Sequence, residues 1–166
     1  MNAIGTAARA PLYEFEITLH ARPDEAATAA TVTDAWGTWP TLAVPREALS
    51  MPMQADFDAT LARLDAYPRF YVEPDGSFVW TSSRDAAAGD AAWWQVDGNA
   101  FEKSGRVLLV DLKGRCPAAD FDLLLAAFGW PAQPLMMQLV RSAAFLDEGV
   151  FRAHAAARGL AGVGKP

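Results

Sequence analysis

The sequence is poor in cysteine and histidine and contains no long apolar run. Its 166 residues include one cysteine, Cys116, and two histidines. A single cysteine excludes an intrachain disulfide framework and a zinc site built from several cysteines. No stretch is long and apolar enough for a signal peptide or a membrane-spanning helix, so we expect a cytoplasmic protein without membrane partners.

Positive charge is also scarce. Lys and Arg number 14 against 20 Asp and Glu, which gives a formal net charge of −6. This balance repels phosphate backbones and no Lys/Arg run offsets it, so we do not expect nucleic acid as a partner. The sequence also lacks a P-loop and a Gly-x-Gly-x-x-Gly motif, and it therefore predicts no nucleotide or other cofactor.

The two histidines do not have metal-site spacing. His20 lies four residues from Glu16 on a predicted strand, a separation of about 13 Å, which is too far for two ligands of one ion. His154 lies in a predicted helix, where a cation near the end interacts favourably with the helix dipole. Without HxxxH, HExxH or CxxC spacing, we predict no metal site.

The composition that remains is that of a packed globule. Hydrophobic residues make up 52% of the chain and charged residues 20%. We expect one domain over residues 1–166, with flexible tails at 1–10 and 160–166.

Several segments predict strands. Residues 13–20 alternate apolar and polar side chains, the period of a half-buried strand. Residues 38–45 predict a short strand, which Pro40 and Pro45 either keep at an edge or end. Residues 69–80 predict a β-hairpin turning at Pro74-Asp75-Gly76, followed by a loop over 82–92. Beyond that loop, breaks at Asp97-Gly98-Asn99 and Ser104-Gly105 predict a meander, with strands at 93–96, 100–103 and 106–112.

Helical spacing appears mainly after the last of these strands. The firmest helices are 54–68, with Asp56 as N-cap, and 119–128, closed by Gly129-Trp130-Pro131. Both contain Ala-Asp-Phe-Asp near their start, which is consistent with a duplicated strand–helix unit but is also expected from acidic first turns that complement the helix dipole, the reading we favour. Further helices are predicted over 22–35, 133–148 and 149–159. The predicted fold is α+β: an antiparallel β-sheet of about five strands, with helices packed on one face and a helical C-terminal segment.

Tryptophan is abundant and carries the functional prediction. Of six tryptophans, Trp36 and Trp39 share a short loop, and Trp93 and Trp94 are adjacent. On a strand, neighbouring side chains point to opposite faces, so one of the adjacent pair faces the core and the other faces solvent or a partner. Trp94 shares a face with Val96 and is our choice for the core. We predict a partner-binding aromatic surface formed from Trp36, Trp39, Trp93 and Trp94.

No catalytic residue is predicted. Asp56/Asp58 and Asp120/Asp122 are two residues apart on predicted helices and therefore diverge. The leading hypothesis is a non-catalytic cytoplasmic interaction module that binds a protein partner or itself through tryptophans. Two alternatives remain. One is a small thiol-dependent enzyme using Cys116, which lies beside Arg115 at a predicted helix start. The other is a carbohydrate-binding domain that stacks its ligand on tryptophan.

Overall fold

A computed structural model of the chain describes residues 12–84 and 93–163. Within these ranges the chain forms nine strands, three α-helices and one 3-10 helix, η1. In chain order they are β1 (Leu12–Ala21), β2 (Ala27–Asp34), β3 (Gly37–Ala43), η1 (Arg46–Ser50), α1 (Phe57–Asp65), β4 (Phe70–Val72), β5 (Ser77–Thr81), β6 (Gln95–Lys103), β7 (Arg106–Pro117), α2 (Ala118–Ala127), β8 (Leu135–Leu139), β9 (Phe145–Asp147) and α3 (Glu148–Gly162). The predicted tail 1–10, residues 85–92 of the predicted loop and residues 164–166 lie outside the described ranges.

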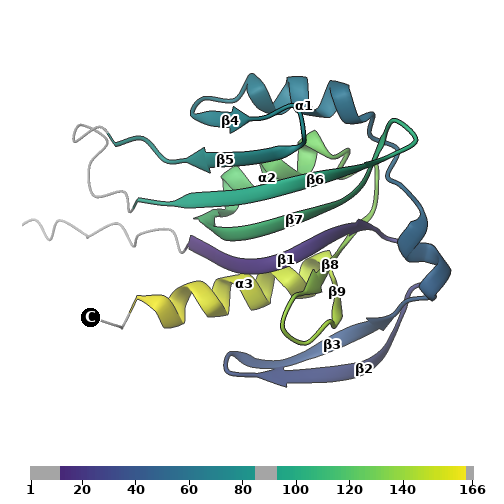
Figure 1. Cartoon of the computed structure of the whole chain (residues 1–166). Helices are drawn as coiled ribbons and strands as arrows, with labels where there is room; N and C mark the ends of the chain where they lie inside the picture. Colours follow the sequence, from purple (N-terminus) through teal and green to yellow (C-terminus); the bar gives the residue numbers. More distant parts are fainter. Residues whose placement is uncertain (1–11, 85–92, 164–166) are drawn as a thin grey trace, which may run out of the picture.

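The strands form one antiparallel sheet in the order β2-β3-β9-β8-β1-β7-β6-β5-β4 (Figure 1). The α+β class is therefore confirmed, whereas the expected number of about five strands is too low for the part of the chain that is described. Strand β1 lies near the middle, and Ile17 pairs with Leu112 of β7 and Leu139 of β8. Of the predicted meander, segments 93–96 and 100–103 both contribute to one strand, β6, which pairs antiparallel with β7. Strand β5 of the preceding hairpin pairs antiparallel with β6 on its other side.

The helix predicted over 22–35 is wrong, because this segment contains strand β2. Thr28, Thr31, Val32 and Thr33 are β-branched, which restricts their side-chain rotamers in a helix and suits a pleated surface. Strand β2 forms a hairpin with β3 and occupies the edge of the sheet. Of the two roles predicted for the prolines of residues 38–45, the edge position is wrong, since β3 lies between β2 and β9. The strand does end before Pro45, at Ala43.

The helix predicted over 133–148 is wrong as well, because β8 and β9 occupy this segment. Four of the five β8 side chains are buried, so apolar residues face both sides of the strand and hide the period-two alternation. A tight turn with Ala143 at φ 57° connects the two strands. The helix predicted over 149–159 is confirmed as part of α3, which continues to Gly162.

The break predicted at Asp97-Gly98-Asn99 is also wrong, because β6 runs through these residues without a turn. Gly98 serves packing instead: a Cβ atom at this position would lie 2.1 Å from Cζ of Phe78 on the neighbouring strand. The glycine thus makes room for an aromatic ring, a use of glycine within strands that looks like a turn signal in the sequence.

Two local predictions are confirmed in detail. Asp56 caps α1, with its side chain accepting a 2.8 Å hydrogen bond from the backbone N–H of Ala59. Strands β4 and β5 form the predicted hairpin, in which Gly76 has φ 95°. A Cβ at Gly76 would lie 2.2 Å from the backbone oxygen of Ala100, so both conformation and space require glycine there.

The helices α1, α2 and α3 pack on one face of the sheet, as predicted. Phe15 of β1 points toward this face and makes edge-to-face ring contacts with Phe121 of α2 and Phe151 of α3, at 5.2 and 6.2 Å between centroids. Phe57 of α1 belongs to the same buried cluster. Figure 1 shows α2 behind β6 and β7. Arg152 ties α3 to α2 through a 2.7 Å ion pair with Asp122.

A smaller cluster lies on the opposite face, near β3 and β8. Leu42 and Met136 are buried there, and Leu49 of η1 packs against them. The segment around η1 thus covers the face opposite the α-helices where β3 and β8 lie. It does not extend over the same face of β4, β5, β6 and β7. Among the described residues, no helix has the length and apolar character needed to cross a membrane.

Candidate functional site

The strands β4, β5, β6, β7 and β1 present a second face, which points away from α1, α2 and α3; we call it the open face. Its side chains form rows across the strands because paired residues point to the same side. One row consists of Tyr71, Val79, Asp97, Lys113 and Glu16, and the next consists of Ser77, Asn99, Asp111 and Thr18. The open face is therefore largely polar, as expected for an antiparallel sheet with one side toward water.

Large apolar side chains interrupt this polar surface. Tyr71, Trp93, Phe101 and Val140 are 64%, 37%, 41% and 49% exposed, respectively. Tyr71 lies on β4, Trp93 precedes β6, Phe101 lies near the end of β6, and Val140 follows β8. Exposed aromatic residues on a sheet face without a covering helix are a feature of interaction surfaces.

The adjacent tryptophans separate as predicted. Trp94 is 7% exposed and packs edge-to-face on Trp80, with 5.2 Å between ring centroids. Its backbone N–H donates to the side-chain oxygen of Ser82 at 3.0 Å. Trp93 points to the open face, where the guanidinium of Arg84 lies 4.7 Å from the centroid of its ring. The sequence alternation thus places Trp94 in the core and leaves Trp93 accessible.

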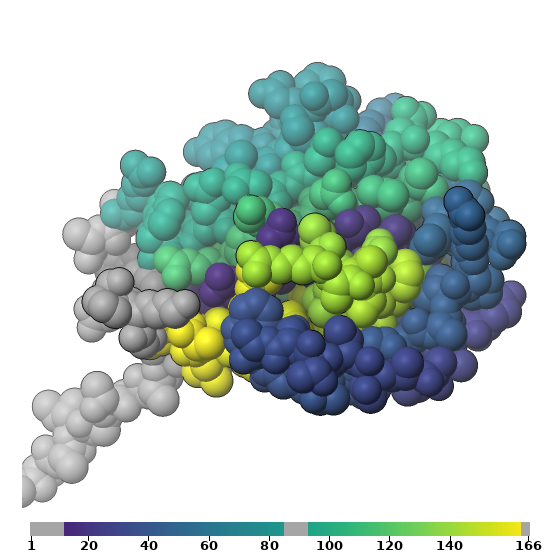
Figure 2. Space-filling view, turned by 60° about the horizontal axis from the view of Figure 1, so that its bottom comes forward, coloured from purple at the N-terminus to yellow at the C-terminus, as the bar shows by residue number. Residues whose placement is uncertain are grey.

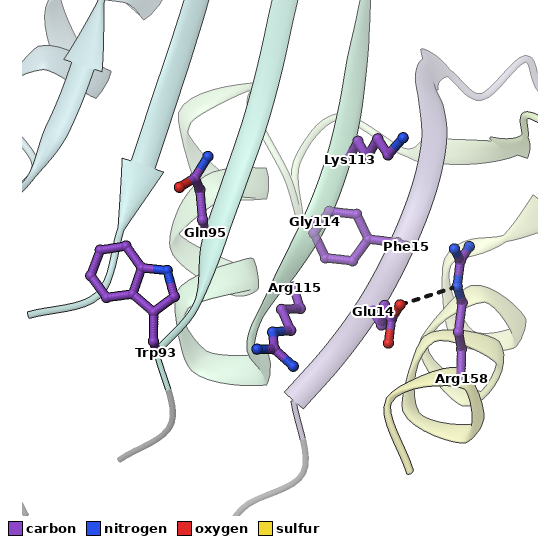
Figure 3. Close-up of a pocket in the computed structure, with 8 residues that line it drawn as sticks. All are labelled: Glu14, Phe15, Trp93, Gln95, Lys113, Gly114, Arg115 and Arg158. Carbon is purple, nitrogen blue, oxygen red and sulfur yellow. Dashed lines mark ion pairs between the residues drawn. The ribbon is translucent and has the colours of Figure 1, made fainter. Parts of the chain in front are cut away.

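Trp93 borders a hollow of about 360 Å³, which we call the Trp93 pocket. Its lining consists of Glu14, Phe15, Trp93, Gln95, Lys113, Gly114, Arg115 and Arg158. Figure 3 shows Trp93 and Gln95 on one side, Glu14 and Arg158 on the other, and Arg115 between them. The pocket therefore combines residues of β1, β6 and β7 with one residue of α3.

Gly114 shapes the middle of this pocket. Its φ is +142°, and a Cβ atom there would lie 2.1 Å from the backbone oxygen of Gln95. A side chain at this position is therefore excluded by the neighbouring strand. Gly114 pairs with Phe15 and Val96, which face the core, whereas its neighbours Lys113 and Arg115 point to the open face.

The Trp93 pocket is positively charged. Lys113, Arg115 and Arg158 face a single carboxylate, that of Glu14. Arg158 Nε lies 3.8 Å from Glu14 Oε1, too far for a hydrogen bond, and this nitrogen is buried with no hydrogen-bond partner among the described residues. Cationic side chains therefore outnumber carboxylates by two among the lining residues. Lys113 also lies 3.9 Å from Glu16, which is outside the lining.

A second hollow of about 460 Å³ adjoins the first along β7 and β1. Its lining has the opposite charge, since Glu16, Asp97 and Asp111 outnumber Lys113. In Figure 2, purple atoms of β1 lie in a furrow between the green atoms of β6–β7 and the yellow-green atoms of residues 135–147. The open face therefore carries a cationic and an acidic region side by side.

A larger hollow of about 700 Å³ lies where the end of β1 meets η1. Arg22 and Arg106 line it together with Asp24, Glu25 and Glu47, so its charges nearly cancel. No aromatic side chain is among its described lining residues. This hollow offers neither a charge surplus nor an aromatic anchor, and the Trp93 pocket offers both.

Trp36 and Trp39 lie away from this pocket, where the β2–β3 hairpin meets α3. Both rings contact the imidazole of His154 edge-on, at centroid distances of 5.5 and 5.2 Å. Both tryptophans are partly buried, and His154 is 2% exposed. Two of the four tryptophans predicted to bind a partner, Trp36 and Trp39, therefore pack around His154 instead.

Asp34 organises this cluster. One carboxylate oxygen, Oδ1, accepts from the backbone N–H of Trp36 at 2.9 Å and from the indole N–H of Trp39 at 3.1 Å. The other oxygen lies 2.7 Å from Nε2 of His154, which donates to an ionised carboxylate. Burial raises the pKa of Asp34, but these hydrogen bonds outweigh it and hold the pKa below its ordinary value.

Arg158 connects the two tryptophan sites. Its guanidinium lies 4.8 Å from the centroid of the Trp36 ring, on the side of α3 that also faces Glu14. A cation held over an aromatic ring has restricted freedom. Trp36 therefore positions a charged residue of the Trp93 pocket without lining the pocket itself.

The thiol of Cys116 lies inside the molecule. Cys116 is a residue of β7 and is 0% exposed. Burial, with a contribution from the charge of Asp120, raises the pKa of this thiol far above its ordinary range. The thiol therefore stays protonated at neutral pH, unlike that of a nucleophilic cysteine.

The histidines lie in different surroundings. His20 is buried beside Phe145, and its Nε2 lies 3.0 Å from the side-chain oxygen of Gln138. Burial lowers the pKa of His20, although Gln138 and the charge of Asp111 act in the opposite direction. Within residues 12–84 and 93–163, no group of three or more His, Cys, Asp or Glu side chains is arranged to hold a metal ion.

Sequence reasoning missed most of the Trp93 pocket. It looked for a run of Lys and Arg, whereas the cations come from alternate positions of one strand and from a helix more than forty residues later. Lys113 and Arg115 do share a face by their spacing, and that signal was present in the sequence. The contribution of Arg158 depends on how α3 crosses β1, which local pattern does not encode.

No protein-family model, curated protein or solved structure matches this chain. The chemistry of the open face is therefore what indicates a function for this protein. That face combines accessible aromatic side chains with a pocket whose charge is opposite in sign to that of the whole chain.

Proposed function

We propose that this protein is a non-catalytic interaction module that docks a protein partner on its open face, with Trp93 at the contact. The single observation that carries the proposal is the exposed Trp93 at the edge of a cation-lined pocket. Tryptophan and arginine are the residue types most enriched where protein interfaces gain their binding energy. We expect the module to work in the cytoplasm, without nucleic acid, as its charge of −6 favours.

Of the tryptophans first considered, Trp93 is the one that supports this proposal. Trp94 is enclosed in the core, and the rings of Trp36 and Trp39 are engaged with His154. Tyr71 and Phe101 extend the apolar contact across β4 and β6. The proposed surface is therefore the open face from Trp93 to Phe101.

Neither alternative has comparable support. A thiol enzyme needs an accessible thiolate, whereas Cys116 is buried and its pKa is raised. We expect slow alkylation of Cys116 by iodoacetamide at pH 7 in the folded protein and fast alkylation after denaturation. A carbohydrate ligand would use the same exposed ring of Trp93, but the surplus of cations over carboxylates in the pocket lining favours an acidic ligand over a neutral sugar.

Site-specific photocross-linking tests the proposal. A photoreactive phenylalanine analogue replaces Phe101 on the open face or Leu123 on α2, which are 41% and 49% exposed. In cells that express the protein, we expect cross-linked protein adducts from position 101 and few from position 123. The additional change Trp93→Ala should reduce the adducts at position 101. Equal yields from the two positions, or yields insensitive to Trp93, would contradict the proposal.

A further inference from the structure

The Trp93 pocket is positively charged, and this charge favours an acidic partner. The chain carries a net charge of −6, yet the pocket lining contains two more cations than carboxylates. The net negative charge of the chain repels acidic partners at long range. An acidic partner is therefore attracted only near this pocket, where cations outnumber carboxylates. Complementary potentials guide which partner docks and in which register.

The cations of the pocket have free hydrogen-bonding capacity. Arg115 is exposed and has no ion pair among the described residues. Lys113 lies 3.9 Å from Glu16 with 71% of its side chain exposed, so this ion pair is weak. Arg158 Nε is buried with no hydrogen-bond partner in the described part of the chain. Carboxylates supplied by a ligand can therefore bind without displacing strong internal pairs.

The spacing of the cations fits an extended peptide. Lys113 and Arg115 are two residues apart on β7, so their side chains leave the same face about 7 Å apart. Alternate residues of an extended chain have the same separation. Gly114 pairs with the core-facing residues Phe15 and Val96, so strand alternation leaves the open face between Lys113 and Arg115 without a side chain.

Trp93 supplies the apolar end of the same site. It lies beside Gln95, which occupies the strand next to that of Arg115 (Figure 3). An indole that is 37% exposed gives an apolar or aromatic side chain of the ligand a surface to pack on. Charge and shape together point to a short acidic segment with one apolar residue.

We propose that the Trp93 pocket binds an acidic, extended segment of a partner protein, with two alternate carboxylates on Lys113 and Arg115 and an apolar side chain on Trp93. This inference rests on the proposed function, because it names the partner chemistry of the same face. Arg115 and Arg158 provide planar donors that can pair with carboxylates in a bidentate manner.

The test is fluorescence anisotropy with labelled peptides and the full chain. The probe peptide has the sequence Ser-Glu-Ser-Glu-Ser-Phe, and its matched control has glutamine in place of both glutamates. We expect saturable binding of the acidic peptide, about tenfold weaker binding of the glutamine peptide, and weaker binding as sodium chloride increases. Equal binding of the two peptides, or no binding of either, would overturn the inference.

Matched variants locate the site. Arg115→Gln should weaken binding of the acidic peptide about tenfold, and Arg115→Lys should restore part of it. Arg106→Gln removes an exposed arginine from the far end of β7 and should leave binding unchanged. Loss of binding in Arg106→Gln with none in Arg115→Gln would overturn the inference, as would tighter binding of a single-stranded oligonucleotide than of the acidic peptide.

The two proposals fail in distinguishable ways. If the acidic peptide does not bind but position 101 still cross-links in a Trp93-dependent manner, the partner chemistry is wrong and the docking face stands. If position 101 gives no Trp93-dependent adducts while the acidic peptide binds through Arg115, the pocket binds acidic ligands but the proposed protein-docking role is wrong.

Discussion

Trp36 and Trp39 both turn toward one buried histidine, whereas Trp93 and Trp94 point to opposite faces of the sheet. Trp36 lies in the turn of a hairpin and Trp39 on its second strand, and Asp34 accepts from the backbone N–H of Trp36 and the indole N–H of Trp39. The second pair enters a strand, where alternation forces the two rings apart. Tryptophans that are close in sequence therefore differ in role according to the backbone that carries them.

The two sites also use charge differently. In the Asp34–His154 cluster, a carboxylate is surrounded by donors and its pKa is lowered, so hydrogen bonds within the fold stabilise its charged form. In the Trp93 pocket, cations outnumber carboxylates and a buried guanidinium nitrogen has no hydrogen-bond partner among the described residues. Each site holds one buried nitrogen without a hydrogen-bond partner among the described residues, Nδ1 of His154 and Nε of Arg158, so the two sites differ in charge rather than in completeness. The Asp34 carboxylate accepts from donors of the fold, whereas the cations of the Trp93 pocket outnumber its carboxylates and are available to a partner.

The largest expected effect comes from Trp94. Trp94→Ala should lower the free energy of unfolding by about 3–5 kcal/mol, because a large buried ring against Trp80 leaves a cavity. Urea unfolding monitored by circular dichroism measures this loss. A change below about 1 kcal/mol would mean that the site collapses around the missing ring and that Trp94 contributes little to the core.

A smaller loss is expected at the hairpin cluster. Asp34→Ala leaves the indole N–H of Trp39, the backbone N–H of Trp36 and the ring of His154 without their acceptor. We expect a destabilisation of about 1–3 kcal/mol in the same unfolding experiment. Asp24→Ala, which alters an exposed carboxylate near the other end of the hairpin, is the control and should stay within about 0.5 kcal/mol of wild type.

The contribution of Asp34 should also depend on pH. Because the pKa of this carboxyl is lower in the folded protein than in the unfolded chain, ionisation stabilises the fold above the unfolded pKa of about 4. That stability is lost as the pH falls through the lowered folded pKa. The difference in unfolding free energy between wild type and Asp34→Ala should therefore be constant near pH 6 and shrink below about pH 4. A difference that grows on acidification would contradict this assignment.

Local chemistry allowed part of the fold to be predicted. The Asp56 cap, the Pro74-Asp75-Gly76 turn and the split of the adjacent tryptophans each depend on a few neighbouring residues, and all three are present. The errors occurred where distant strands decide the outcome. Gly98 was predicted to break the strand, but it makes room for the ring of Phe78 on the neighbouring strand. The β8 segment was predicted to be helical because both of its faces are buried, which removes the alternation typical of a strand.

The candidate site was less predictable than the fold. Trp93 was identified from alternation alone, but the cations around it come from β7 and α3. His154, interpreted as a cation at a helix end, is instead buried against two tryptophans of a hairpin more than one hundred residues earlier. Such contacts are fixed by the order of strands in the sheet, which the periodicity of single segments does not determine.

The smallest effect on stability is expected at Trp93, and it completes the contrast with Trp94. Trp93→Ala removes an exposed ring whose main internal contact is the guanidinium of Arg84, so it should change the free energy of unfolding by less than about 1 kcal/mol. The same variant should reduce binding of the acidic peptide, since it removes the apolar end of the pocket. Trp93→Phe, which keeps an aromatic ring, should retain most of that binding. A stability loss at Trp93 as large as that at Trp94 would show that both rings support the fold, and the adjacent pair would then no longer distinguish a core residue from a binding residue.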